Sequence, residues 1–236
     1  MRERAPKLSL LLIPLALLCV WLGFWQLQRM HAKQTLFDQF EQAPALKLGQ
    51  AAQQDLAFAQ VQTAGRYEPG WHLLLDNKIL HGSTGVHVLS LFRPAQGLPI
   101  LVNRGWLPLP PDRRHLPEFV TPTEVIDISG MLIASSGGGI RLGKTDDLAD
   151  LQGPRLVTYL SIPDLEAAIG EAVSSRQILL DADQPWGFDG RNWQPAVMLP
   201  AQHRAYAVQW FALAVAAGIF WLAIVFRRAQ VFSPHR

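Results

Sequence analysis

The feature that most constrains this chain is the apolar stretch between Gln202 and Arg228. It opens with a His-Arg pair, carries no charged side chain from Ala205 to Phe226, and ends at two arginines. An α-helix needs roughly 20 apolar residues to cross the hydrocarbon core of a bilayer. A second apolar stretch lies near the N-terminus, at residues 8–25. The sequence therefore predicts two membrane-spanning helices with the remaining residues between them.

The first apolar stretch has two interpretations. A basic start followed by an apolar run is also typical of a cleaved signal peptide. Here the run ends at Trp21 and Trp25, bulky residues where a cleavage site requires small ones. Tryptophans are enriched at the membrane–water interface. We therefore expect an uncleaved anchor, whose helix continues out of the membrane through residues 30–40 and ends before Pro44.

The basic residues predict the topology. They precede the first span and follow the second, which favours a cytoplasmic location for both termini. The expected organisation is a cytoplasmic N-terminus (1–7), a first span (8–28), an extracytoplasmic domain (29–203), a second span (204–226) and a cytoplasmic C-terminus (227–236).

Composition supports this division. Of the 236 residues, 17% are charged and 49% are hydrophobic, whereas a soluble domain carries about 25% charged residues. The apolar excess lies in the two terminal stretches, and the middle is long enough for one globular domain. The net charge of +2 is small, and the basic residues gather at the membrane flanks. We expect membrane lipid as a partner and no nucleic acid.

The middle of the chain alternates between apolar and polar residues, which is typical of antiparallel strands. Turns are expected at Pro69-Gly70 and at residues 76–78, and one helix from Pro163 to about Ala172, capped near Ser161. The predicted fold class is an α+β membrane protein: a two-helix transmembrane hairpin with an intervening β-rich, barrel-like extracytoplasmic domain. The expected strands are 60–67, 71–76, 86–92, 100–102, 124–133, 156–160 and 177–180.

No catalytic motif stands out. Cys19, the single cysteine, lies in the first apolar stretch, so an internal disulfide is excluded. The glycines at 137–139 lack the Gly-Lys-Ser/Thr that would make a phosphate loop and predict a flexible hairpin loop. No nucleophile elbow or triad spacing is present. We expect a protein that is not an enzyme.

Two other polar groups in the middle have structural interpretations. His72, His81 and His87 match no metal-ligand spacing and are expected to be ordinary surface histidines. Arg104 follows a buried run, and the neighbouring Gly105 is suited to a backbone angle that other residues avoid. We expect a corner of the sheet there, with Arg104 able to pair with a carboxylate such as that of Asp76 or Asp181.

His203 is the strongest candidate for a functional side chain. It stands where the second span meets the headgroups, and helical spacing puts Tyr206, Trp210 and Leu213 on its stripe. An imidazole above two aromatic rings suits a flat, lipophilic haem, whose iron often takes a histidine ligand. The alternative is an interfacial histidine beside Arg204 with belt aromatics. The residues alone leave both interpretations open.

An ordered set of motifs resembles the SURF1 family of cytochrome c oxidase assembly factors. Any one of these motifs is weak, but together they cover nearly the whole chain in order. They are GFWQLQR (23–29), GRY (65–67), GVHV (85–88), VNRGW (102–106) and HRAYAVQWF (203–211).

The resemblance implies a chaperone-like membrane assembly factor that binds haem a and helps to insert it into subunit I of a haem-copper terminal oxidase, alongside other oxidase assembly factors. It implies that His203 belongs to the haem site and could ligate the haem iron, and that Trp210 matches a motif position. Trp25, Gln26 and Arg29 also match motif positions, and the Arg29 guanidinium suits a haem propionate. The cofactor-binding set expected is His203, Tyr206, Trp210, Trp25 and Arg29.

Two expectations remain. The N-terminus lacks the Arg- and Ser-rich extension of a mitochondrial presequence, which favours a bacterial inner membrane with the central domain in the periplasm. The alternative function is a membrane scaffold that binds no haem and holds oxidase subunits during assembly.

Overall fold

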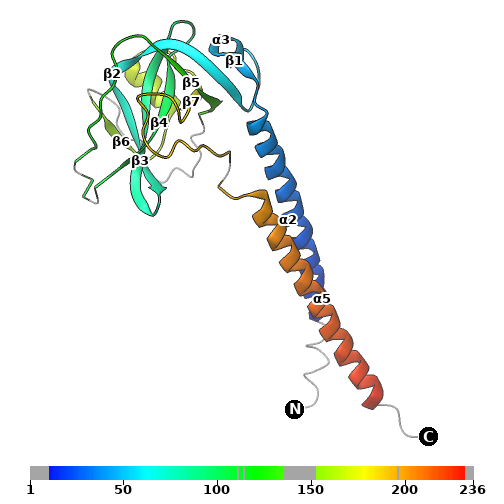
Figure 1. The fold of residues 1–236 in the computed structure, drawn as a ribbon. Helices are drawn as coiled ribbons and strands as arrows, with labels where there is room; N and C mark the ends of the chain where they lie inside the picture. The colour runs from blue at the N-terminus through cyan, green and yellow to red at the C-terminus, as the bar shows by residue number, and fades with distance from the viewer. Residues whose placement is uncertain (1–10, 111, 114, 136–152, 196, 232–236) are drawn as a thin grey trace. The chain divides into compact units, whose positions relative to one another are not determined.

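A computed structural model describes residues 11–110, 112–113, 115–135, 153–195 and 197–231 (Figure 1). The chain divides into two compact units. One contains the two terminal helices, and the other is Gln39–Trp193. The predicted arrangement of two apolar terminal helices around a sheet-rich middle is confirmed.

The terminal unit is a pair of long helices, α2 (Leu12–Glu41) and α5 (Pro200–Val231) (Figure 1). Both are long and apolar enough to cross a membrane, with mean hydropathies of 1.3 and 2.1. As expected, α2 continues past its apolar part, and it ends at Glu41, three residues before Pro44. Proline disfavours the helical conformation in the residue before it, which limits how far the helix can extend.

The two helices are antiparallel and face each other along a seam. On each helix, less exposed positions recur at alternating spacings of four and three residues. This period is the one that lets two α-helices keep the same faces in contact. The seam positions are Leu12, Ala16, Cys19, Gly23, Gln26 and Met30 on α2, and His203, Ala207, Trp210, Ala214, Ala217 and Trp221 on α5.

The second unit is built on a seven-stranded sheet. Its longer strands coincide with apolar or alternating stretches of the sequence. The strand path is β1-β2-β3-β4-β7-β5, β5 pairs again with β2, and β6 pairs with β2. The domain is therefore sheet-rich as predicted, and its description as a barrel stays a prediction. The strands are β1 (Ala45–Lys47), β2 (Ala59–Leu80), β3 (Ser83–Pro94), β4 (Ile100–Pro108), β5 (Ile126–Ala134), β6 (Arg155–Val157) and β7 (Arg176–Leu180).

The turns expected at Pro69-Gly70 and at residues 76–78 are wrong. The strand β2 passes through both places, and its pairing with β3 shifts register between Tyr67 and His72 and between Leu75 and Lys78. Such irregularities bend a strand without ending it. The chain reverses instead at His81-Gly82, where both residues have positive φ angles of 48° and 79°.

Two short helices complete the sheet domain. The helix α4 (Ile162–Ile169) begins after Ser161, whose hydroxyl accepts a hydrogen bond from the Asp164 backbone amide. It ends at Gly170, which adopts a left-handed φ of 80°, so it is shorter than the predicted helix. The helix α3 (Leu48–Ala51) follows β1 directly. The glycine-rich loop predicted around 137–139 lies outside the described residues.

The expected pairing of Arg104 with Asp76 or Asp181 is wrong. Asp76 pairs with Arg113 at 2.5 Å, and Asp181 accepts a hydrogen bond from the Ser129 hydroxyl at 2.7 Å. Among the described residues, no carboxylate pairs with Arg104. The unusual backbone angle expected at Gly105 is confirmed, because its φ is 112° and a Cβ there would lie 2.6 Å from a backbone oxygen. The expected corner is wrong, because β4 runs through this position from Ile100 to Pro108.

Arg104 is nevertheless wholly buried. Its guanidinium donates hydrogen bonds to the Trp186 carbonyl (2.8 Å), the Thr121 hydroxyl (2.8 Å) and the Val120 carbonyl (2.9 Å). These hydrogen bonds connect the segments around Val120 and Trp186 to strand β4, which carries Arg104. The guanidinium also lies over the rings of Tyr67, Phe119 and Phe188.

The prediction that His72 is a surface histidine is also wrong. Its side chain is buried, with Nδ1 2.9 Å from the Ser90 hydroxyl. His87 is partly buried, and only His81 is exposed. The cause is the course of β2 and β3, whose pairing places both His72 and His87 within the sheet.

Candidate functional site

His203 lies in the first turn of α5, which begins at Pro200. Proline suits the first turn of a helix because its fixed φ is helical and its missing N–H needs no partner there. His203 is only 8% exposed. Its Nδ1 lies 2.8 Å from Oε1 of Gln26 on α2. This contact joins two residues that are far apart in the sequence and fixes which way the imidazole faces.

A close helix–helix contact supports this pair. Gly23 lies one turn before Gln26 on α2, and a Cβ at position 23 would come within 2.6 Å of the Phe211 ring. Phe211 also packs edge-on against Phe24, with ring centroids 5.3 Å apart. The absence of a side chain at Gly23 thus lets α5 approach α2 closely, a common use of small residues between membrane helices.

The other predicted residues gather on one flank of the Gln26–His203 pair. An α-helix turns by about 100° per residue. Gln26 and His203 are the facing positions of the two antiparallel helices. Counting 100° per residue from them places Trp25 and Arg29 on the same side of the hairpin as Tyr206 and Trp210. Gly23 and Phe211 fall on the opposite side.

These flanking residues also lie at different positions along the helix axes. With a rise of about 1.5 Å per residue, Arg29 lies about 4–5 Å beyond Gln26 toward the C-terminal end of α2. Tyr206 and Trp210 lie about 4–5 Å and 10 Å from His203 toward the charge-free part of α5. The flank therefore has a cationic end and an aromatic, apolar end.

Trp25 and Arg29 contact each other, because the guanidinium of Arg29 lies over the Trp25 ring at 5.5 Å. Arg29 is exposed and, within the described part of the chain, makes no ion pair with a carboxylate. Tyr206 is also exposed, whereas Trp210 is partly buried in the seam. The stripe expected from the sequence therefore divides, with Trp210 in the seam and Tyr206 on the exposed flank.

Gln26 was not predicted as a partner of His203. Gln26 belongs to the motif at the exit of the first span, but nothing in the sequence paired it with the second span. Its position in the four-three seam pattern, shared with Gly23 and Cys19, was the available signal. That pattern becomes informative only when two helices are known to pack together.

An apolar groove lies between the same two helices farther from His203. Its volume is about 320 Å³. None of the described residues that line it is ionisable, so the groove offers mainly apolar contact. Its lining is Leu12, Ile13, Ala16, Leu17, Val20, Ala214, Val215, Gly218 and Trp221.

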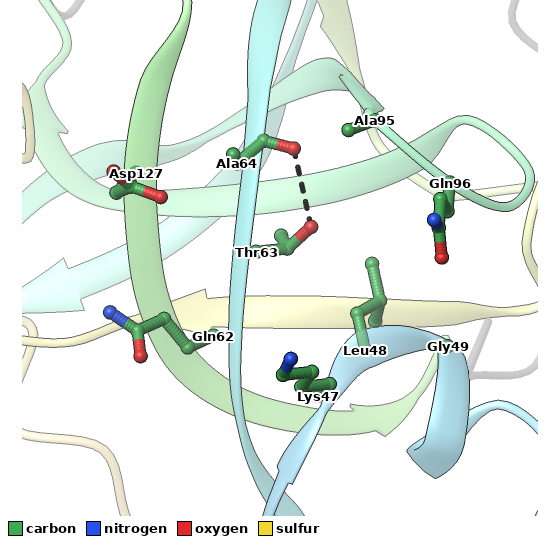
Figure 2. A pocket seen from close by; sticks show the side chains of 9 residues that line it. All are labelled: Lys47, Leu48, Gly49, Gln62, Thr63, Ala64, Ala95, Gln96 and Asp127. Carbon is green, nitrogen blue, oxygen red and sulfur yellow. Dashed lines mark hydrogen bonds between the residues drawn. The ribbon is translucent and has the colours of Figure 1, made fainter.

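The sheet domain has a polar pocket of about 470 Å³ beside β1 and β2 (Figure 2). Its charged side chains, Lys47 and Asp127, lie apart in the view, and the hydrogen bond drawn runs from the Thr63 hydroxyl to the Ala64 carbonyl. No nucleophile–base pair faces this space among the residues that line it. The pocket therefore has no arrangement that indicates catalysis.

Burial lowers the pKa values of two histidines in the sheet domain. Burial, with a smaller contribution from the Arg104 charge, lowers the pKa of His72 to about 4. Burial, with a smaller contribution from Lys78, lowers that of His87 to about 4. Both imidazoles are therefore neutral at pH 7. Over the described ranges, no group of three or more His, Cys, Asp or Glu residues converges to hold a metal ion.

The fold and site define a class of protein: two apolar terminal helices packed as a hairpin, a sheet-rich domain between them, and a buried histidine in the hairpin. The chain belongs to the SURF1 family, whose model matches residues 13–215. It is also similar to a SURF1-like protein from Rickettsia prowazekii (strain Madrid E), with 23% identity over 221 residues, 89% of this chain and 86% of that protein. The resemblance noted from the motifs is confirmed. Membership of this family implies a role in cytochrome c oxidase assembly.

Proposed function

We propose that this protein carries haem a to subunit I of a haem-copper oxidase and that His203 ligates the haem iron while the haem is bound. The single observation that carries the proposal is the environment of His203. Its Nδ1 is engaged by Gln26, while Nε2 has no hydrogen-bond partner among the described residues. A buried imidazole with one nitrogen held and the other free suits axial ligation.

The surrounding side chains fit the other parts of a haem. A porphyrin is flat and apolar, and it carries propionates on one edge. Tyr206 and Trp210 offer aromatic surface on the flank of His203, in the direction of the charge-free part of α5. Arg29 offers a guanidinium at the opposite end, which can bind a carboxylate through two parallel hydrogen bonds.

We also propose where the protein lies in the cell. The two helices cross a bacterial inner membrane with both termini in the cytoplasm, and the sheet domain, closed as a barrel, lies in the periplasm. The basic residues at the two flanks support this orientation. His203 and Arg29 then lie near the periplasmic surface of the membrane. Oxidase subunit I and other assembly factors are the proposed partners.

The test is a visible spectrum of the full-length protein purified with and without co-produced haem a. We expect a haem a spectrum in the first case only and a loss of bound haem in His203→Ala. The matched control is His31→Ala, because His31 is an exposed histidine on α2. Full haem occupancy in His203→Ala would refute the assignment of the ligand.

The same preparations address the alternative function as a scaffold. A scaffold that binds no haem would co-purify with oxidase subunits equally well with or without His203. No haem a spectrum in the wild-type protein, together with unchanged co-purification of subunit I in His203→Ala, would favour the scaffold over the haem carrier.

A further inference from the structure

Gln26 on α2 lies opposite His203 on α5. Among the described residues of the two helices, this is the only pair of side chains that forms a hydrogen bond from one helix to the other. The atom that faces His203 is the amide oxygen Oε1, 2.8 Å from Nδ1. A carbonyl oxygen accepts hydrogen bonds and cannot donate them. Nδ1 must therefore carry the ring proton in this contact.

The position of the proton decides which nitrogen can bind a metal. A neutral imidazole has one N–H and one nitrogen lone pair. With the proton on Nδ1, the lone pair lies on Nε2, the nitrogen that has no partner among the described residues. The opposite tautomer would place a proton on Nε2 and prevent it from acting as a ligand.

From this geometry we infer that Gln26 is a positioning residue: it fixes the tautomer and orientation of His203 so that Nε2 is the nitrogen offered to haem iron. This inference rests on the proposed function and extends it to a residue outside the expected haem-binding set. Histidines that ligate metals generally donate their second N–H to a nearby acceptor, and loss of that acceptor typically costs 10–100-fold in affinity.

The chemical nature of Gln26 adds a second consequence. A carboxylate acceptor would draw the Nδ1 proton more strongly and make Nε2 a better donor to iron. The neutral amide orients the ring with a smaller increase in basicity. An amide at position 26 thus holds the ligand in place without maximising the strength of its bond to the cargo, which suits a protein that must release haem.

The first experiment uses the haem-free protein in lipid bilayers, labelled with 15N-histidine, and reads the tautomer of His203 by magic-angle-spinning NMR. The His203 signals are identified by their loss in His203→Ala. We expect the proton on Nδ1 in the wild type and in Gln28→Leu, a matched control at an exposed glutamine on the same helix. In Gln26→Leu we expect the Nε2-protonated tautomer to appear.

The second experiment measures haem a binding by the same variants. Gln26→Leu should weaken binding about 10–100-fold, Gln28→Leu should leave it unchanged, and Gln26→Glu, which keeps an acceptor oxygen, should restore binding and slow haem release relative to the wild type.

The inference is overturned if wild-type His203 is protonated on Nε2, if the tautomer is unchanged in Gln26→Leu, or if the tautomer changes while haem affinity does not. These failures are distinct from failure of the proposed function. A wild-type protein that binds no haem would remove the role of Gln26 in ligation, while the NMR spectra would still decide whether Gln26 sets the tautomer.

Discussion

Replacing Arg104 by methionine tests what the buried guanidinium contributes to the sheet domain. Methionine keeps an unbranched side chain of similar length and removes the charge and all the N–H donors. The hydrogen bonds to Trp186, Thr121 and Val120 are then lost. The buried acceptors must find water or remain without a donor, which is costly inside a protein.

The size of the effect follows from two opposing contributions. Three hydrogen bonds from a charged donor, at about 2 kcal/mol each, favour the native state by about 6 kcal/mol. Burial opposes this, since it lowers the pKa of Arg104 to about 10, a shift equivalent to about 3 kcal/mol. We therefore expect Arg104→Met to destabilise the domain by about 3 kcal/mol. For a domain of this size, that corresponds to a fall in Tm of about 6–12 °C.

The assay is thermal unfolding of the full-length protein in detergent, followed by near-ultraviolet circular dichroism, which reports the packing of aromatic side chains. The matched control is Arg66→Met, because Arg66 is an exposed arginine on β2. Exposed substitutions of this kind change stability by about 0.5 kcal/mol or less. If Arg104→Met melts at the same temperature as Arg66→Met, the buried guanidinium does not stabilise the domain in the way described.

Two further predictions concern pH and helix packing. His72 and His87 have pKa values of about 4 when folded and 6.5 when unfolded, so the unfolded state binds more protons below pH 6.5. Stability should be complete above that pH and fall by about 2 kcal/mol per histidine by pH 5; denaturant titrations that give equal stability at pH 7.5 and 5 would contradict this. In the hairpin, Gly23→Val places a methyl-bearing carbon against Phe211, whereas Gly218→Val enters open space. Spin-label distances between the two helices should lengthen or broaden only for Gly23→Val, and an equal response from both variants would refute the close contact.

Much of the architecture could be predicted from the sequence. The uncharged run from Ala205 to Phe226 favours a helix in a bilayer, because its length suits a spanning helix and a helix pairs the backbone groups within the segment. The N-cap at Ser161 and the left-handed residue Gly105 were also predictable, since both depend on local backbone chemistry. Family membership followed from ordered motifs that the comparison confirmed.

The sheet pairings were less predictable because a local pattern does not distinguish a turn from a bulge. Pro69-Gly70 and Asp76-Asn77 are typical turn residues, yet β2 continues through both positions because β3 pairs with it on either side. The partner of Arg104 was mispredicted for a similar reason. Charge alone favoured a carboxylate, whereas the fold surrounds the guanidinium with carbonyls, hydroxyls and aromatic rings.

The sequence by itself determined that His203 stands at the start of an apolar helix, beside aromatic residues at helical spacing. It left two roles open because a single helix does not say what lies opposite. Only the tertiary structure placed Gln26 against Nδ1, since that contact joins positions 177 residues apart. Such a contact depends on how two helices pack, with Gly23 allowing the close approach. The identity of the histidine is therefore a property of the sequence, and the direction in which its free nitrogen points is a property of the fold.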